Sequence, residues 1–184
     1  MDMKRIEDLS REELIKRLRL ACELASAVDG LWFLAAEQAE GFDKALAMDV
    51  QVWERYASLC IKRIRKYYPI GSNGLEAFKE IMRIDPLWLH VEFELIGESK
   101  DRLTFQVNKC PFLEAMERMG RPVLTCEPVE TAYLTAMAQA LDPRIRVQPI
   151  KLPPRKSKDE ICCQWLLSVD QASFLPAPGP GATP

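Results

Sequence analysis

The chain has 184 residues and a formal net charge of −2, with 25 basic and 27 acidic side chains. Hydrophobic residues make up 48% and charged residues 28%, which is the balance of one domain that buries a core of its own. The near-neutral charge argues against nucleic acid as a partner, because phosphate binding requires a basic excess or a concentrated basic face. The first residues are charged and no apolar stretch is long enough to span a bilayer, so we expect a cytoplasmic protein without membrane contact.

The first half of the chain has the pattern of helices. Ser10, with Glu13 three positions later, forms a capping box at the start of the first helix. Gly30 is expected to kink or end this helix, and Gly41 marks the next break. The long helix that follows is predicted by apolar residues at every third or fourth position: Leu46, Val50, Trp53, Ala57, Cys60, Ile64 and Tyr68. A short helix over residues 75–84 closes this half.

The second half alternates between polar and apolar residues, which is the pattern of strands. The predicted elements are, in order, strands near 90–96 and 102–108, helices near 111–119 and 128–140, and strands near 145–150 and 161–169. Segregated strands and helices predict an α+β fold. In this fold, N-terminal helices precede a β-β-α-α-β-β antiparallel-dominated sheet that has helices on one face.

The composition divides the chain into three parts. Residues 1–86 form a helical region, and residues 87–170 form an α+β domain that contains a set of cysteines. We expect these two parts to pack as one compact unit. Residues 171–184 are rich in proline and glycine, a composition that cannot build a core, so we expect a disordered tail.

Three cysteine motifs in the second half are the most informative feature of the sequence. Cys110 follows the second strand, Cys126 precedes the second helix of the domain, and Cys163 lies in the last strand. We expect these three cysteines to approach one another at one end of the sheet, whereas Cys22 and Cys60 lie on apolar helix faces and belong to the core. Thiols stay reduced in the cytoplasm, which favours metal binding, catalysis or plain burial over disulfides.

Two chemistries are open to the three cysteines. Helix N-termini favour the thiolate, so Cys110 and Cys126 are expected to have a lowered pKa and to react as nucleophiles. Alternatively, the three sulfurs bind zinc, with a fourth ligand from water, Glu127 or the single histidine, His90. Buried and inert cysteines remain the third interpretation.

Other parts of the sequence indicate no specific chemistry. There is no C-x-x-C pair, no G-x-S-x-G and no glycine-rich phosphate loop. A group of acidic residues surrounds the Trp32-Phe33 patch and is interpreted as solvated helix faces: Glu37, Glu40, Asp43, Asp49 and Glu54. The aromatic residues of these helices are expected in a helix–helix core or at an interface between two copies of the chain.

The most extensive sequence resemblance is carried by Gly30-Leu31-Trp32-Phe33, Glu37, Gly41-Phe42, Ala45-Leu46, Asp49, Val52-Trp53-Glu54 and Lys62-Arg63-Ile64. Through these residues the N-terminal half resembles a family of small, mostly uncharacterised bacterial cytosolic proteins. From about His90 to Val169, the order of Cys110, Cys126 and Cys163-Gln164-Trp165 resembles that of L-2-amino-thiazoline-4-carboxylic acid hydrolase-like proteins. The closing strand is more distantly similar to the 4-vinyl reductase-type ligand-binding domain.

These observations predict a cytosolic protein that binds a small molecule or a metal in a three-cysteine pocket formed by Cys110, Cys126 and Cys163. The resemblance implies an alternative, a cysteine- or zinc-dependent hydrolase of a small amino-acid-like C–N or C–S ring. Its catalytic residues would be Cys126, with Glu127 or Glu130 moving protons. A third alternative is an interaction protein with a vestigial site. We also expect a homodimer that forms through the N-terminal helices.

Overall fold

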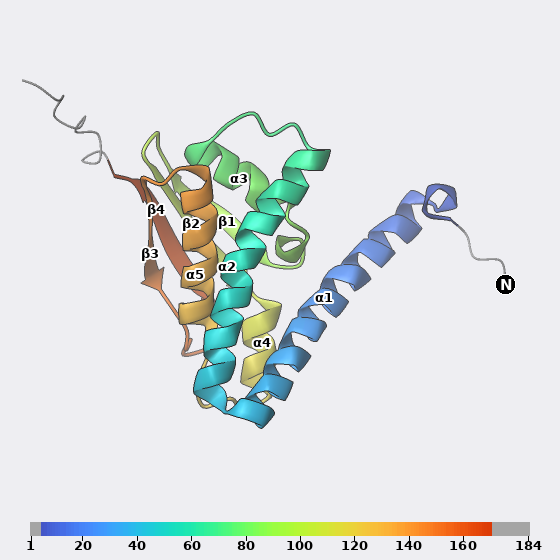
Figure 1. The fold of residues 1–184 in the computed structure, drawn as a ribbon, viewed down its shortest axis with the longest axis vertical. Coiled ribbons are helices and arrows are strands. Elements are labelled where there is room, and N and C mark those ends of the chain that lie inside the picture. The colour runs from blue at the N-terminus through green and yellow to red at the C-terminus, as the bar shows by residue number, and fades with distance from the viewer. Residues whose placement is uncertain (1–4, 171–184) are drawn as a thin grey trace, which may run out of the picture.

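The computed structural model describes residues 5–170 and has an α+β architecture in which helices pack on a four-stranded antiparallel sheet, as the sequence predicts (Figure 1). The elements are, in chain order, η1 (Ile6–Asp8), α1 (Arg11–Glu40), α2 (Phe42–Tyr67), α3 (Gly74–Ile84), η2 (Pro86–Trp88), β1 (Glu92–Glu98), β2 (Arg102–Lys109), α4 (Pro111–Arg118), α5 (Cys126–Leu141), β3 (Ile145–Lys151) and β4 (Cys163–Val169). The expected tail, residues 171–184, lies outside the described residues. None of the helices within residues 5–170 is both long and apolar enough to cross a membrane.

The start of α1 matches the capping box. Ser10 is the N-cap, and its hydroxyl oxygen accepts a 3.2 Å hydrogen bond from the backbone N–H of Glu13. Of the two outcomes expected at Gly30, the end of the helix is wrong, because α1 continues through this residue to Glu40. A glycine inside a helix costs only about 1 kcal/mol relative to alanine, which the packing of buried Phe33 one turn later offsets.

Gly41 separates α1 from α2 and turns the chain back on itself. Its φ of 85° lies in the region that favours glycine. The two helices form a hairpin that is packed near this turn and opens toward the N-terminus of α1, which projects away from the body (Figure 1).

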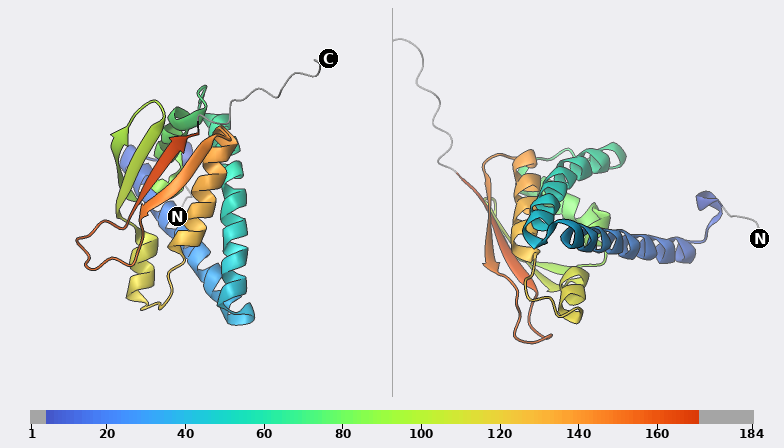
Figure 2. Two further views of the ribbon diagram at one scale, coloured as in Figure 1. Left: turned by 90° about the vertical axis from the view of Figure 1, so that its left-hand side faces the viewer. Right: turned by 60° about the horizontal axis from the view of Figure 1, so that its bottom comes forward.

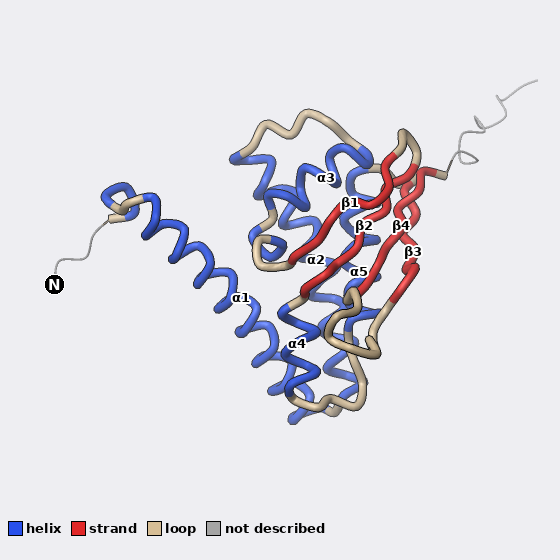
Figure 3. The backbone as a smooth tube through the Cα atoms, turned by 180° about the vertical axis from the view of Figure 1, so that it is seen from behind, coloured by secondary structure: helices blue, strands red, loops and turns tan. Residues whose placement is uncertain are grey.

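The sheet has the strand order β1-β2-β4-β3, and every neighbouring pair is antiparallel (Figure 3). In the central pair, Phe105 lies opposite Trp165 and Leu103 lies opposite Leu167, and all four side chains are buried. They mark the face that α5 covers, and α2 packs on the other side of α5 (Figure 2). Buried residues therefore alternate with more exposed ones along β2, so that one face of the strand packs on the core and the other faces solvent.

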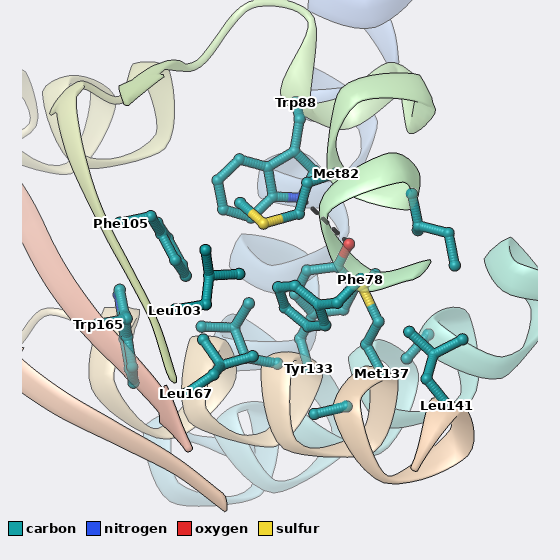
Figure 4. Close-up of a cluster of buried hydrophobic side chains, with 14 of the residues drawn as sticks. Phe78, Met82, Trp88, Leu103, Phe105, Tyr133, Met137, Leu141, Trp165 and Leu167 are labelled. Carbon is teal, nitrogen blue, oxygen red and sulfur yellow. Dashed lines mark hydrogen bonds between the residues drawn. The ribbon is translucent and has the colours of Figure 1, made fainter. Parts of the chain in front are cut away.

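The core fills the space between the sheet and the helices (Figure 4). Phe105 and Trp165 from the sheet meet Trp88 of η2 and Tyr133 and Met137 of α5. Trp88 packs edge to face on Phe105, with a centroid separation of 5.7 Å, and its indole N–H donates to the Tyr133 hydroxyl at 3.2 Å. This aromatic wall continues toward the end of the sheet where the cysteines lie.

Candidate functional site

A cavity of about 120 Å³ lies at the end of the core, between β2, β4, α4, α5 and the α1–α2 hairpin. Four of the six cysteines border it: Cys110, Cys126, Cys162 and Cys163. The remaining wall is mostly apolar and aromatic. The three cysteines predicted to share a pocket therefore border one cavity, and Cys162 joins them.

The pairing of β2 with β4 determines where two of these cysteines lie. Cys163 is the cross-strand partner of Val107, and the backbone N–H of Cys162 donates to the Val107 carbonyl at 2.7 Å. Cys110 follows three residues after Val107, as the N-cap of α4, where Pro111 begins the helix. The end of β2 and the start of β4 thus bring Cys110, Cys162 and Cys163 to the same end of the sheet.

Cys126 reaches the cavity from the opposite side. It is the first residue of α5, which starts two residues earlier than predicted. Trp165, two residues after Cys163 in β4, shares its side of the strand. Cys22 and Cys60 are buried in the helical layer, away from this cavity.

The pKa values of the cavity thiols are raised. Burial raises the pKa of Cys110 and of Cys126 to about 12, and it also raises the pKa of Cys163. The expected lowering of the thiol pKa at a helix N-terminus is therefore wrong, because desolvation of the thiolate outweighs the favourable helix end. These cysteines are neutral thiols at neutral pH.

The described residues do not form a metal site of the usual kind. Within residues 5–170, no group of three or more histidine, cysteine, aspartate or glutamate side chains is placed so that it could hold a metal ion. His90, considered as a fourth zinc ligand, does not border the cavity; its Nε2 lies 2.9 Å from the Ser26 hydroxyl of α1. Burial lowers the pKa of His90, so the ring is neutral in this contact.

The two carboxylates considered as proton carriers have different positions. Glu127 is exposed, and its side chain lies outside the cavity. Glu130, one turn further along α5, borders the cavity beside the cysteines. Burial raises the pKa of Glu130 to about 7, and the nearby Asp85 carboxylate contributes to the rise. Of these two glutamates, only Glu130 can therefore act on a molecule in the cavity.

The sequence analysis missed two carboxylates that border the cavity from the helical hairpin. Asp29 of α1 and Asp49 of α2 lie next to each other near the indole of Trp53. Asp49 was interpreted as part of a solvated face, but only 4% of its surface is exposed. Burial and the neighbouring Asp29 raise the pKa of Asp49 to about 7. The signal for Asp29 was present, since it is the single charged residue in an otherwise uncharged stretch, residues 25–36.

Two polar atoms of the cavity wall have no hydrogen-bond partner among the described residues. They are Oδ1 of Asp49 and Nε1 of Trp165, and both are buried. An unpartnered buried polar group costs about 1–3 kcal/mol. Such groups are rare in native proteins, so their position on a cavity wall points to a molecule that supplies the missing partners.

A buried hydrogen-bond network supports the cavity floor. Asp85 is fully buried and accepts hydrogen bonds from the hydroxyls of Tyr56 and Tyr133, at 2.9 and 2.8 Å, and from the Cys60 thiol at 3.2 Å. It also accepts from the backbone N–H of Leu87. The network fixes α2, α5 and η2 relative to one another. It therefore fixes Tyr133, whose ring borders the cavity.

An ion pair fastens the β3–β4 loop over the cavity. The Arg155 guanidinium donates two hydrogen bonds of 2.8 Å to the carboxylate of Glu117 in α4, and its side chain is 4% exposed. Its Nη1 also lies 3.7 Å from the Cys162 sulfur. Because Leu152 and Pro153 of the same loop border the cavity, this pair holds one wall in place.

Residues 7–169 match a family model whose description is "Family of unknown function (DUF6125)". The chain belongs to this family. The match runs from η1 to the end of β4, so every residue of the cavity wall, from Asp29 to Trp165, lies within the DUF6125 region. No curated protein matches the chain.

Proposed function

We propose that this DUF6125 protein binds a small molecule in the cysteine-lined cavity. The observation that carries the proposal is the pair of buried, unpartnered polar atoms on the cavity wall, Oδ1 of Asp49 and Nε1 of Trp165. A bound ligand that offers one donor and one acceptor removes the cost of both. The mostly apolar wall with a few polar groups is the usual composition of a small-molecule site.

The state of the thiols favours binding over nucleophilic catalysis. Attack requires a thiolate, and Cys110 and Cys126 are protonated at neutral pH because burial raises the pKa of each to about 12. A neutral thiol is a small, polarisable group that lines an apolar pocket well. All six cysteines are free, which fits a reducing compartment, and we include a cytoplasmic location in the proposal.

The cavity volume sets the size of the ligand. An apolar cavity of roughly 150 Å³ binds benzene, so a cavity of about 120 Å³ has room for a group near the size of a single ring. The proposal therefore concerns a compact molecule, such as a single substituted ring, rather than a nucleotide or a peptide.

A fragment screen by thermal shift tests this proposal. The screen uses neutral and charged single-ring compounds on the wild-type protein and on Val129→Phe, which adds a ring to the cavity wall on α5. The matched control is Val123→Phe, at an exposed position outside the cavity. We expect fragments that stabilise the wild type and Val123→Phe but not Val129→Phe. Stabilisation that survives equally in Val129→Phe, or no stabilising fragment at all, contradicts the proposal.

We also propose that the protein forms a homodimer through α1. Leu20, Leu24, Val28 and Leu31 recur at intervals of four, four and three residues, and each is more than half exposed. They lie on the side of α1 opposite to buried Phe33, so no part of the described chain covers them. This spacing suits pairing with a second helix, and a two-fold axis presents the same stripe from each copy.

Light scattering at micromolar concentration tests the dimer. The wild type is expected to have the mass of two chains, and Leu24→Glu the mass of one. Leu59→Glu, on an exposed position of α2, is the control and is expected to remain dimeric. A monomeric wild type, or a Leu24→Glu variant that still dimerises, contradicts the proposal.

A further inference from the structure

The charged side chains of the cavity wall are all acidic. Among residues 5–170, three carboxyl groups border the cavity, those of Asp29, Asp49 and Glu130, and no lysine, arginine or histidine does. The carboxyls form two groups. Asp29 and Asp49 adjoin each other on the helical hairpin, whereas Glu130 lies among the thiols of Cys110, Cys126 and Cys163, as their mutual electrostatic effects show.

One oxygen of the Asp49 carboxyl, Oδ1, has no hydrogen-bond partner among the described residues, although the Trp53 indole lies close to the carboxyl. The carboxyl is buried in the second turn of α2, and its Oδ1 accepts no hydrogen bond from any described residue. The only group that favours its ionised form is the indole of Trp53, which also favours that of Asp29. A cationic donor from a ligand would satisfy Oδ1 and relieve the repulsion between the two carboxylates.

The surroundings of this pair suit an organic cation. Trp53 packs edge to face against Phe112 and Tyr133, with centroid separations of 6.3 and 5.5 Å, and all three rings border the cavity. Aromatic faces attract cations, most strongly when water is excluded. A bare metal ion is disfavoured, because the described residues offer no group of three ligands and the wall is largely apolar.

We infer that the cavity selects a small organic cation, an amine or amidine about the size of a single ring, whose charged group is bound by Asp49 together with Asp29 and whose body lies against Trp53. This inference rests on the proposed function, since it names the class of ligand for the same cavity. The opposite end of the ligand lies beside the thiols and Trp165, whose indole N–H has only the weak sulfur acceptor of Cys163 near it and makes no hydrogen bond of normal geometry among the described residues.

Three compounds of the same shape and number of non-hydrogen atoms separate charge from size: benzamidinium, benzamide and benzoate. Their affinities are measured by calorimetry at pH 8, where the Asp49 carboxyl is mostly ionised because its pKa is about 7. We expect benzamidinium to bind at least tenfold more tightly than benzamide, and benzoate to bind weakest. The conservative variant Asp49→Asn is expected to abolish the preference for benzamidinium, and Asp29→Asn to reduce it. Glu54→Gln, an exposed carboxyl on the same helix, is the control and keeps the preference.

The outcomes distinguish this inference from the proposed function. If benzamide or benzoate binds as tightly as benzamidinium, and binding is lost in Val129→Phe, the cavity is a ligand site but the inference of a cationic ligand is overturned. A benzamidinium preference that persists in Asp49→Asn also overturns it, because another carboxylate then carries the selectivity. If none of the three compounds binds, the inference fails, and the fragment screen decides separately whether the cavity binds ligands at all.

Discussion

The hydroxyl of Tyr133 donates a 2.8 Å hydrogen bond to Asp85, and this contact joins the cavity wall to the buried network of the helical layer. Tyr133 also accepts a hydrogen bond from the Trp88 indole. The Tyr133 ring that borders the cavity is therefore held by one acceptor, Asp85, and one donor, Trp88, at the two ends of η2. A site built on such a support keeps its shape without a ligand, which lowers the cost of binding.

Removing Asp85 is expected to destabilise the fold strongly. Asp85→Ala leaves the hydroxyls of Tyr56 and Tyr133 and the thiol of Cys60 without their acceptor in the core. At about 1–3 kcal/mol for each unsatisfied buried group, the free energy of unfolding should fall by at least about 3 kcal/mol in urea titrations.

Two further variants calibrate this loss. Tyr133→Phe removes one member of the network and is expected to cost about 1 kcal/mol. Asp43→Ala, at an exposed position of α2, is the control and should change stability by less than about 0.5 kcal/mol. A loss below about 1 kcal/mol for Asp85→Ala would show that the network does not hold the helices together.

Glu130 makes stability depend on pH in a defined direction. Its pKa is about 7 in the folded protein and 4.5 for the free group, so between these values the folded state holds a proton that the unfolded state releases. Stability therefore falls as the pH rises from about 4.5 to 7, and the penalty is constant above that. Glu130→Gln removes the penalty. It should be more stable than the wild type by roughly 3 kcal/mol at pH 8, with little difference near pH 4.5.

Urea unfolding at the two pH values measures this effect. Glu127→Gln, at the exposed glutamate in the same helix, should change stability by less than about 0.5 kcal/mol at either pH. A Glu130→Gln variant that is less stable than the wild type at pH 8 would mean that the ionised carboxylate is stabilised in the fold.

Local sequence chemistry predicted much of this architecture. The cap at Ser10, the break at Gly41 and the alternation along β2 act within a few residues, and each appears in the structure where the sequence indicates it. The continuation of α1 through Gly30 was not predictable, because it depends on the burial of Phe33 against residues distant in sequence.

The candidate site was predictable only in part, for the same reason. The order of strands and helices brings Cys110, Cys126 and Cys163 to one cavity. Burial in that cavity raises the pKa values of Cys110 and Cys126. This burial depends on the β3–β4 loop and the α1–α2 hairpin that cover the cavity, and the spacing of the cysteines along the chain does not reveal it. Asp49 lies four residues after Ala45 and eight before Ala57, on the buried side of α2, so the helical spacing held a signal for its burial that its charge concealed.

The cavity cysteines are expected to react slowly with alkylating reagents at neutral pH. With a pKa of about 12, the thiolate fraction of Cys110 and Cys126 at pH 7 is more than a hundredfold below that of a free thiol with a pKa of about 8.5. Mass spectrometry after iodoacetamide treatment should therefore show labelling at least about a hundredfold slower than in the urea-unfolded protein, accelerating toward pH 10. Equal rates in folded and unfolded protein would instead support reactive, low-pKa cysteines.

Arg155 is expected to hold the β3–β4 loop against α4. Arg155→Gln removes the paired hydrogen bonds to Glu117, so amide hydrogen exchange should quicken across residues 152–162, and the free energy of unfolding should fall by about 1–3 kcal/mol. Lys156→Gln, at the exposed neighbour, serves as the control and should leave exchange unchanged. Unaltered exchange in Arg155→Gln would show that other contacts fix this wall of the cavity.

The most direct test of the ligand site is the NMR signal of the Trp165 indole N–H while a fragment from the screen is titrated. In the free protein this buried donor has no partner among the described residues, and it borders the cavity. We predict that the Trp165 and Trp53 indole signals shift together and saturate at one equivalent of bound fragment, while the half-exposed Trp32 indole, which lies outside this cavity, stays unchanged. The Trp165→Phe variant assigns the signal. If stabilising fragments leave the Trp165 and Trp53 signals in place, or shift Trp32 alone, the ligand does not occupy the cysteine-lined cavity.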